Sequence, residues 1–244
     1  MNERTLADLF TRERRSDRPA LVDATAREYD AHWLITSSWK AGNFLRHSGV
    51  RRGVRVGIVG DGPLAVLAFF GTTLLEGTSQ FAPPITLAGE DDVRAIVGPV
   101  DELDEYDLPA GAQRIGYGRK PADPAVHHFD AGLWSENPSF PPLEIDPDTN
   151  VIAGPNGSYS HGEVLETARE VISEYGIESG TSVGVDAPLS DPRTVVAGLI
   201  APLVSEGVIV LGSDADLVVA DGASEEAATE PIHLETVPLP LSQE

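Results

Sequence analysis

The sequence predicts an α/β fold of two related lobes, with mostly parallel sheets and flanking helices. Short apolar runs typical of buried strands alternate with longer segments whose apolar residues recur at helical spacing. The two halves of the chain also repeat the same order of motifs. We expect a first α/β lobe with its N-terminal segment at 1–145, a second, shortened α/β lobe at 146–222, and an acidic, proline-containing tail at 223–244.

The first half opens with Thr5-Leu6-Ala7-Asp8, a capping-box-like start to a short helix that ends near Arg14. Two longer helices follow, and Gly49 and Gly77 end them because glycine tolerates the left-handed backbone of a helix end. The expected helices are 31–48 and 64–76, and the expected strands are 20–23, 27–29, 54–59, 79–82, 93–97, 114–117 and 126–129.

The second half follows a segment rich in Pro, Asp and Gly over 101–150. Ser160-His161-Gly162-Glu163 fits a capping box, in which a serine and a glutamate satisfy the first N–H groups of a helix. The expected helices are 160–175 and 193–206, and the expected strands are 151–153, 182–186, 208–211 and 217–220.

An internal repeat relates the halves. In each, a tyrosine leads a helix, and a glycine pair then precedes a buried strand, with Gly53 matching Gly180 at an offset of 127. Gly77 matches Gly207 after the next helix, at an offset of 130. Gene duplication explains this pattern, and so does convergence of two unrelated βαβ units on the same order of elements.

Charge and composition exclude several classes of function. The chain has 17 Lys and Arg against 39 Asp and Glu, a net charge of −22, and it has no cysteine. Disulfides and thiolate metal sites are therefore excluded, and we expect neither nucleic acid nor a membrane surface as a partner. The sequence shows no secretory signal or spanning segment, which predicts a cytoplasmic protein.

Only two of the basic residues, Lys40 and Lys120, are lysines. A dispersed acidic surface with so little lysine predicts a salt-adapted, haloarchaeal-like protein, although an ordinary acidic protein gives the same composition. High salt screens the repulsion among like charges, so we expect the melting temperature to rise between dilute buffer and molar KCl. Thermal unfolding followed by circular dichroism tests this, and equal melting temperatures in the two solutions would contradict it.

Two glycine turns are candidate phosphate sites. Gly60-Asp61-Gly62-Pro63-Leu64-Ala65 fits a dinucleotide fingerprint, but the acidic residue expected about twenty positions later is missing. In the second turn, a strand is expected to run through Gly154, Asn156, Gly157 and Ser158 into the helix at Ser160, so that backbone N–H groups could point at a phosphate.

Histidines give no clear catalytic or metal site. His127 and His128 would point to opposite faces of a strand, so they cannot chelate one metal together. His161 lies too close in sequence to Ser158 and Ser160 to be trusted as the base of a nucleophilic serine. We therefore predict no catalytic residue and no metal site.

The ordered series of motifs resembles the AMP-forming acyl-CoA synthetases of the adenylate-forming ligase superfamily. The resemblance covers roughly residues 5–211. The matching pieces are Arg18-Pro19-Ala20-Leu21-Val22-Asp23, Gly49-Val50-Arg51-Arg52-Gly53-Val54-Arg55-Val56, Asp148-Thr149-Asn150-Val151-Ile152, Ser160-His161, and Leu199-Ile200-Ala201-Pro202-Leu203 with Gly207-Val208-Ile209-Val210-Leu211. It implies the fold of the N-terminal part of such a ligase, with ATP or AMP as the possible ligand; no cofactor is certain.

The departures from that family predict lost activity. The family's Ser/Thr-rich phosphate loop with its Pro-Lys-Gly is shortened here, and Gly154, Asn156, Gly157 and Ser158 remain as its remnant. The family's later motifs and its C-terminal lysine domain are not found in the sequence. We expect an acyl-CoA synthetase-like pseudoenzyme that is inactive alone and acts as a binding or regulatory partner. The alternatives are a nucleotide- or acyl-binding module without turnover, or half of a split AMP-forming acid–CoA ligase.

The shortened second lobe also predicts association. The segment 193–206 is apolar almost all round, and the strand 208–211 is an unbroken apolar run. Such elements normally need cover on both faces. We expect a homodimer or a hetero-partner to supply that cover; the alternative is that the tail folds back, with 232–237 adding an edge strand.

Overall fold

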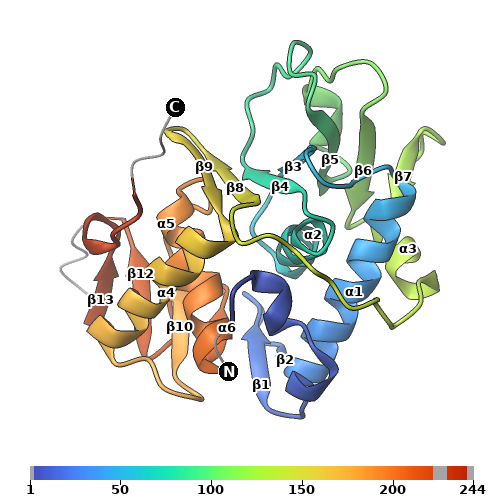
Figure 1. The fold of residues 1–244 in the computed structure, drawn as a ribbon. Helices are drawn as coiled ribbons and strands as arrows, with labels where there is room; N and C mark the ends of the chain where they lie inside the picture. Colours follow the sequence, from blue (N-terminus) through green and yellow to red (C-terminus); the bar gives the residue numbers. More distant parts are fainter. Residues whose placement is uncertain (1–2, 222–229, 241–244) are drawn as a thin grey trace. The chain divides into compact units, whose positions relative to one another are not determined.

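The computed structural model describes residues 3–221 and 230–240. Its contacts divide the chain into two compact units. Unit 1 comprises Met1–Ile35, Asp146–Thr149 and Gly154–Glu244, and unit 2 comprises Thr36–Ile145 and Asn150–Ala153. Each unit is built on one mostly parallel sheet with helices beside it (Figure 1), so the predicted fold class is confirmed.

The sheet of unit 1 has the strand order β13-β12-β10-β11-β1-β2. Neighbouring strands run parallel, except that β1 and β2 form an antiparallel hairpin. The strands are β1 (Pro19–Val22), β2 (Glu28–Asp30), β10 (Ser182–Val185), β11 (Val208–Val210), β12 (Leu217–Ala220) and β13 (Glu230–His233). Its helices are α4 (His161–Tyr175), α5 (Pro192–Val195), the π-helical turn η4 (Val196–Ile200) and α6 (Ala201–Ser205), with short 3-10 turns η1 (Leu6–Leu9), η2 (Arg12–Arg14) and η5 (Leu234–Thr236).

The sheet of unit 2 has the order β7-β6-β5-β3-β4-β8, and β9 follows β8. The strands are β3 (Arg55–Ile58), β4 (Thr78–Phe81), β5 (Val93–Pro99), β6 (Gln113–Tyr117), β7 (Val126–His128) and β8 (Asn150–Gly154); β9 (Gly157–Ser160), which neighbours β8 in this sheet, belongs to unit 1 by its contacts. The helices are α2 (Pro63–Thr73), α3 (Phe129–Ser135) and the turn η3 (Leu103–Glu105), together with most of α1 (Ala31–His47), in which the boundary between the units falls.

The internal repeat is visible in the backbone. The series β2, α1, β3, α2, β4, β5 in the first half corresponds to β9, α4, β10, α5 to α6, β11, β12 in the second. The same unusual conformations recur, since Glu76 and Glu206 both have positive φ, of 58° and 61°. The same hydrogen bonds recur as well: Gly53 N donates to Glu76 O over 3.4 Å, and Gly180 N donates to Glu206 O over 3.2 Å.

The hairpin of each half, β1–β2 or β8–β9, pairs with a strand of the other half's sheet. Strand β1 pairs with β11, placing Leu21 opposite Ile209, and the corresponding strand β8 pairs with β4 through Ser79 and Ile152. Residues 1–35 therefore belong to unit 1 with the second half, whereas sequence order alone places them within 1–145. The reason is that strand pairing, unlike helix packing between neighbours, can join segments that are far apart in the chain.

The apolar segment predicted as one helix at 193–206 is observed as α5, η4 and α6 in direct succession. Pro202 has no N–H, so the ordinary bond to the carbonyl four residues earlier cannot form. The helix is π-helical just before Pro202, where Ala201 N donates to Val196 O, five residues earlier.

The tail forms an edge strand in its described part. β13 runs parallel to β12, with Ile232 opposite Val219. Strands β11 and β12 are buried, with side chains no more than 9% exposed. The edge strand expected at 232–237 is observed at 230–233, whereas 234–236 form the 3-10 turn η5, and residues 223–229 and 241–244 of the expected tail lie outside the described residues.

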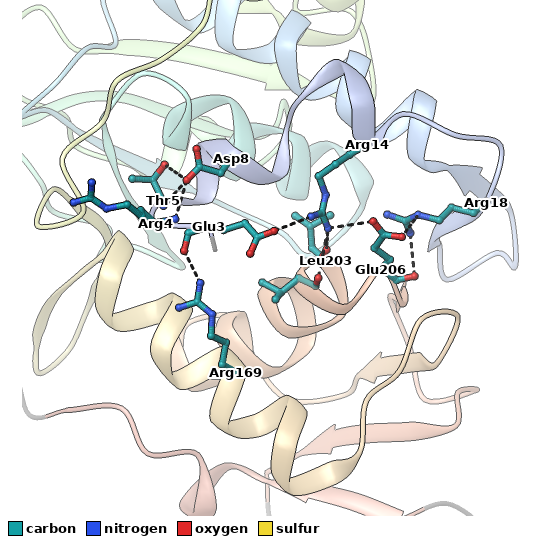
Figure 2. Close-up of polar contacts among 10 residues, drawn as sticks. Glu3, Arg4, Thr5, Asp8, Arg14, Arg18, Arg169, Leu203 and Glu206 are labelled. Atoms are coloured by element: carbon teal, nitrogen blue, oxygen red, sulfur yellow. Dashed lines mark hydrogen bonds and ion pairs between the residues drawn. The ribbon is translucent and has the colours of Figure 1, made fainter. Parts of the chain in front are cut away.

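The N-terminal segment is fastened to unit 1 by charged hydrogen bonds (Figure 2). The Arg14 guanidinium, itself nearly buried, contacts the Glu3 carboxylate at 3.2 Å and donates to Leu203 O over 2.9 Å. Arg18 donates to Glu206 O over 3.1 Å, and Arg169 donates to the Glu3 carbonyl. Because the last carbonyls of a helix carry partial negative charge, two arginines at the end of α6 are favourably placed.

We predict that replacing Gly71 by alanine destabilises unit 2. An alanine Cβ there would lie 2.8 Å from the backbone of Ala41 and Gly42, where α2 crosses α1. In an unconstrained helix Gly→Ala gains about 0.5–1 kcal/mol, whereas overpacking costs about 1–3 kcal/mol. We expect Gly71→Ala to lower the free energy of unfolding, measured by chemical denaturation.

The control is Gly89→Ala, because a Cβ at Gly89 meets no atom within 4 Å. We expect that change to stay within roughly 0.5 kcal/mol of the wild type. A Gly71→Ala protein at least as stable as the wild type would contradict the close helix crossing.

Candidate functional site

The predicted phosphate loop is a tight β-hairpin. Gly154 ends β8, the turn consists of Pro155 and Asn156, and Gly157 and Ser158 begin β9. The expected path from a strand through an open loop directly into a helix is therefore wrong, because β9 intervenes. Gly157 has φ 126°, a conformation that glycine adopts readily and that allows the chain to reverse over two residues. Whether these four residues hold a ligand stays a prediction.

Packing accounts for the glycine that ends β8. A Cβ on Gly154 would lie 2.4 Å from Cγ of Pro192, the first residue of α5. The hairpin thus lies directly against the start of that helix, and a side chain at this position would push the two apart. Close packing, with or without a ligand, is sufficient to require glycine here.

The start of α4 is closed by its own side chains, as the sequence predicts. Ser160 Oγ accepts from Glu163 N over 3.3 Å, and the Glu163 carboxylate accepts from Ser160 N over 2.8 Å. The same carboxylate accepts from Ser160 Oγ over 2.9 Å. The capping box is therefore confirmed, and it places a carboxylate where a phosphate would otherwise find N–H donors.

The start of α5 is likewise occupied by a carboxylate. The N-cap residue Asp191 accepts from Arg193 N over 2.9 Å, and Pro192 contributes no N–H at all. The Arg193 guanidinium donates back to Asp191, from Nε over 3.0 Å and from Nη2 over 2.6 Å. The cation at this helix start is thus bound to its neighbour two residues earlier.

The ion pair shifts the pKa of both of its groups. Burial alone would raise the pKa of the Asp191 carboxyl, but the hydrogen bonds from Arg193 outweigh it and hold the pKa below its usual value. The hydrogen bond to Asp191 raises the pKa of the Arg193 guanidinium in turn. Both groups stay charged at neutral pH, and each is the other's hydrogen-bond partner.

His161, the first residue of α4, is a structural residue in this fold. Its side chain is fully buried, and Nδ1 accepts from Leu6 N over 3.1 Å. Burial lowers the pKa of the imidazole to about 4, although the charge of Asp8 opposes the shift. The ring is therefore neutral at pH 7 and carries its proton on Nε2. Since Ser160 Oγ is bonded to Glu163, serine and histidine form no nucleophile and base pair here.

The remaining sequence candidates are dispersed. His127 Nε2 lies 3.0 Å from Gln113 Oε1, and His128 Nε2 lies 3.5 Å from an Asp130 carboxylate oxygen, so the adjacent histidines have separate partners. No cluster of metal-ligating side chains occurs among the described residues. Lys40 lies in α1 and Lys120 in the connection between β6 and β7, both in unit 2, whereas the hairpin turn belongs to unit 1. No helix in the described part of the chain is long and apolar enough to cross a membrane.

Comparison with solved structures identifies the fold. An anthranilate CoA ligase in complex with anthranoyl-AMP matches 88% of this chain and 49% of its own, at TM-score 0.75 and 16% identity. A benzoate CoA ligase from Burkholderia xenovorans LB400 matches 88% of this chain and 49% of its own, at TM-score 0.71 and 19% identity. A nonribosomal peptide synthetase matches 91% of this chain and 23% of its own, at TM-score 0.68 and 20% identity.

These likenesses define the fold class. The chain has the fold of the N-terminal part of adenylate-forming ligases, as the sequence resemblance predicts. It spans about half the length of the CoA ligases that it matches. No protein-family model matches the sequence, and no curated protein does.

We predict that His161 makes stability fall in acid. The pKa of the His161 imidazole is about 4 in the folded protein, below the ordinary 6.5. Between pH 4 and pH 6.5 this side chain is therefore protonated in the unfolded chain but neutral in the folded one. The contribution is fully present above pH 6.5 and declines by about 3 kcal/mol as the pH falls to 4.

The variant His161→Gln isolates the pH-dependent contribution of His161 to stability, because glutamine keeps an acceptor for Leu6 N and does not titrate. We expect the free energy of unfolding of the wild type to exceed that of the variant by a constant amount from pH 7 to 8. We expect this excess to shrink as the pH falls toward 4. Urea denaturation at each pH measures it, and a difference that stays constant down to pH 4 would contradict the buried neutral ring.

Proposed function

We propose that this chain is an acyl-CoA synthetase-like protein that forms no adenylate by itself and acts as a binding or regulatory partner of another polypeptide. The observation that carries the proposal is the two-residue turn between β8 and β9. So short a turn has too few backbone N–H groups to surround a triphosphate, which usually requires a longer glycine-containing loop.

Electrostatics supports the same proposal. Phosphoryl and adenylyl transfer require cations that stabilise the charge developing on the phosphates. Beside the hairpin, the helix starts carry the carboxylates of Glu163 and Asp191 instead, and the Arg193 guanidinium is bound to Asp191. A polyphosphate at this place would meet the carboxylates of Glu163 and Asp191, and the Arg193 guanidinium there is already paired.

We predict that the pure protein gives no ATP–pyrophosphate exchange above a protein-free blank with acetate, benzoate or a long-chain fatty acid, in molar KCl with Mg²⁺. Incorporation of labelled pyrophosphate into ATP measures this, and a complete CoA ligase serves as the positive control. Isothermal titration with ATP, AMP and CoA in the same buffer tests separately for binding without turnover.

The contradicting outcome is exchange that belongs to this chain rather than to a contaminant. Arg193→Met distinguishes the two, because it removes the guanidinium beside the hairpin and leaves a contaminant unaffected. Exchange that is present in the wild type and lost in Arg193→Met would overturn the proposal. Exchange that appears only when a second, purified polypeptide is added would favour the split-ligase alternative.

A further inference from the structure

An exposed tryptophan stands out on unit 2. Trp134, near the end of α3, is 83% exposed, whereas Phe129 and Leu133 on the same helix are buried. Among the described residues, Ile85 is the other large apolar side chain that is exposed, at 57%. An exposed tryptophan lacks the large hydrophobic free energy that burial of its side chain would give. Tryptophan is also among the residue types enriched at interface hot spots.

The helix that carries Trp134 is held rigidly. The rings of Phe44 and Phe129 meet edge to face, with centroids 5.4 Å apart. Gly132 passes so close to Phe44 that a Cβ would lie 2.1 Å from the ring. Trp134 is thus presented by a fixed helix, which reduces the ordering cost of a binding event.

The segment after α3 is also fastened to α1. Asn43 Nδ2 donates to Asn137 O and to Ser139 O, each over 3.0 Å. His47 Nδ1 lies 3.1 Å from Glu136 Oε1. These contacts hold the chain after Trp134, and the packing of Phe129 and Gly132 holds it before, so the indole is carried on a fixed backbone.

A strand edge lies beside this helix. β7 runs directly into α3 and is the outermost strand of its sheet in the described part of the chain, pairing only with β6 (Figure 1). An outer strand offers backbone N–H and C=O groups to an added strand, and proteins often block such edges with proline or lysine. β7 contains neither, since it consists of Val126, His127 and His128, and its short length of three residues limits how many bonds an added strand can form.

Charge indicates what would bind there. The segment 121–137, which contains β7 and α3, has three carboxylates, at Asp123, Asp130 and Glu136, and no lysine or arginine. The whole chain carries −22, so a second copy would bring like charges together. A partner segment with basic side chains would be attracted instead.

We propose that β7 and Trp134 together form a docking surface for an extended, basic segment of a partner polypeptide. The segment adds a strand to the edge of β7, places an apolar side chain on the indole of Trp134, and pairs its basic side chains with the carboxylates of 121–137. This proposal rests on the binding role proposed above and gives the partner its chemistry.

The test uses the full chain and a fluorescein-labelled nonapeptide of alternating arginine and valine, with fluorescence anisotropy as the readout. Two further peptides serve as comparisons: one with glutamate in place of arginine, and one methylated on alternate backbone nitrogens. We expect saturable binding of the basic peptide alone, at least tenfold weaker in Trp134→Ala and within twofold of wild type in the matched control Ile85→Ala. Nitrogen-15 NMR shifts should map to 126–135.

Several results would overturn the proposal. They are no saturable binding of the basic peptide below about 1 mM, equal affinities of Trp134→Ala and wild type, and undiminished binding of the methylated peptide. A dimer in light scattering that Trp134→Ala abolishes would show that a second copy covers the surface, and would overturn it too. Because none of these measurements involves ATP, their failure is distinguishable from ATP–pyrophosphate exchange by the pure protein.

Discussion

Reciprocal strand pairing is the constraint on which the rest of this structure depends. The hairpin of the first half completes the sheet of unit 1 through β1 and β11, and the hairpin of the second half completes the sheet of unit 2 through β8 and β4. Neither sheet is complete with residues of its own half. Both depend on pairings between segments well over 50 residues apart, which raises the loop-closure cost of folding. The arrangement also explains why the N-terminal segment is fastened so firmly, since residues 3–18 lead directly into β1 and bond to α4 and α6 within the same unit.

The hairpin between β8 and β9 has a structural role that does not depend on what its turn contains. β8 must pair with β4, and β9 must lead into the capped start of α4, so both strands are needed whatever their turn contains. The turn itself, Pro155 and Asn156, belongs to neither strand, so its length can vary without breaking either sheet. A fold of this kind can therefore lose a phosphate loop while keeping its core, because catalytic loops are carried by the scaffold and do not hold it together.

Much of the fold could be predicted from the sequence, for local reasons. Strands such as β3 and β11 are apolar runs bounded by glycine, and the caps at Thr5 and Ser160 depend on residues three positions apart. β9 was missed because Gly-Ser-Tyr-Ser has no apolar alternation, and its strand character comes from the turn before it. The partners of β1 and β8 could not be predicted either, since no local pattern specifies which distant strand an edge will join. For the candidate site, the sequence points to the glycine turn at 154–158, whose ligand stays a prediction, but it does not single out the carboxylate at the start of α5. Asp191-Pro192 before an apolar helical segment was the signal that could have found it.

The arginines of this chain explain how so acidic a molecule keeps a well-ordered interior. Arg14 and Arg18 bond to the last carbonyls of α6, Arg94 and Arg114 bond to loop carbonyls, and Arg169 bonds to the Glu3 carbonyl. Others are paired with carboxylates, as Arg55 is with Glu90 and Asp92, and Arg193 is with Asp191. Arginine suits these positions better than lysine because its planar group donates in several directions at once and loses less hydration. These seven of the 17 cations are thus engaged within the fold, while 39 acidic residues dominate the charge that an approaching molecule encounters. A surface of that kind repels phosphates and nucleic acids and attracts basic polypeptides, and the binding role proposed above rests on that charge together with the two-residue turn.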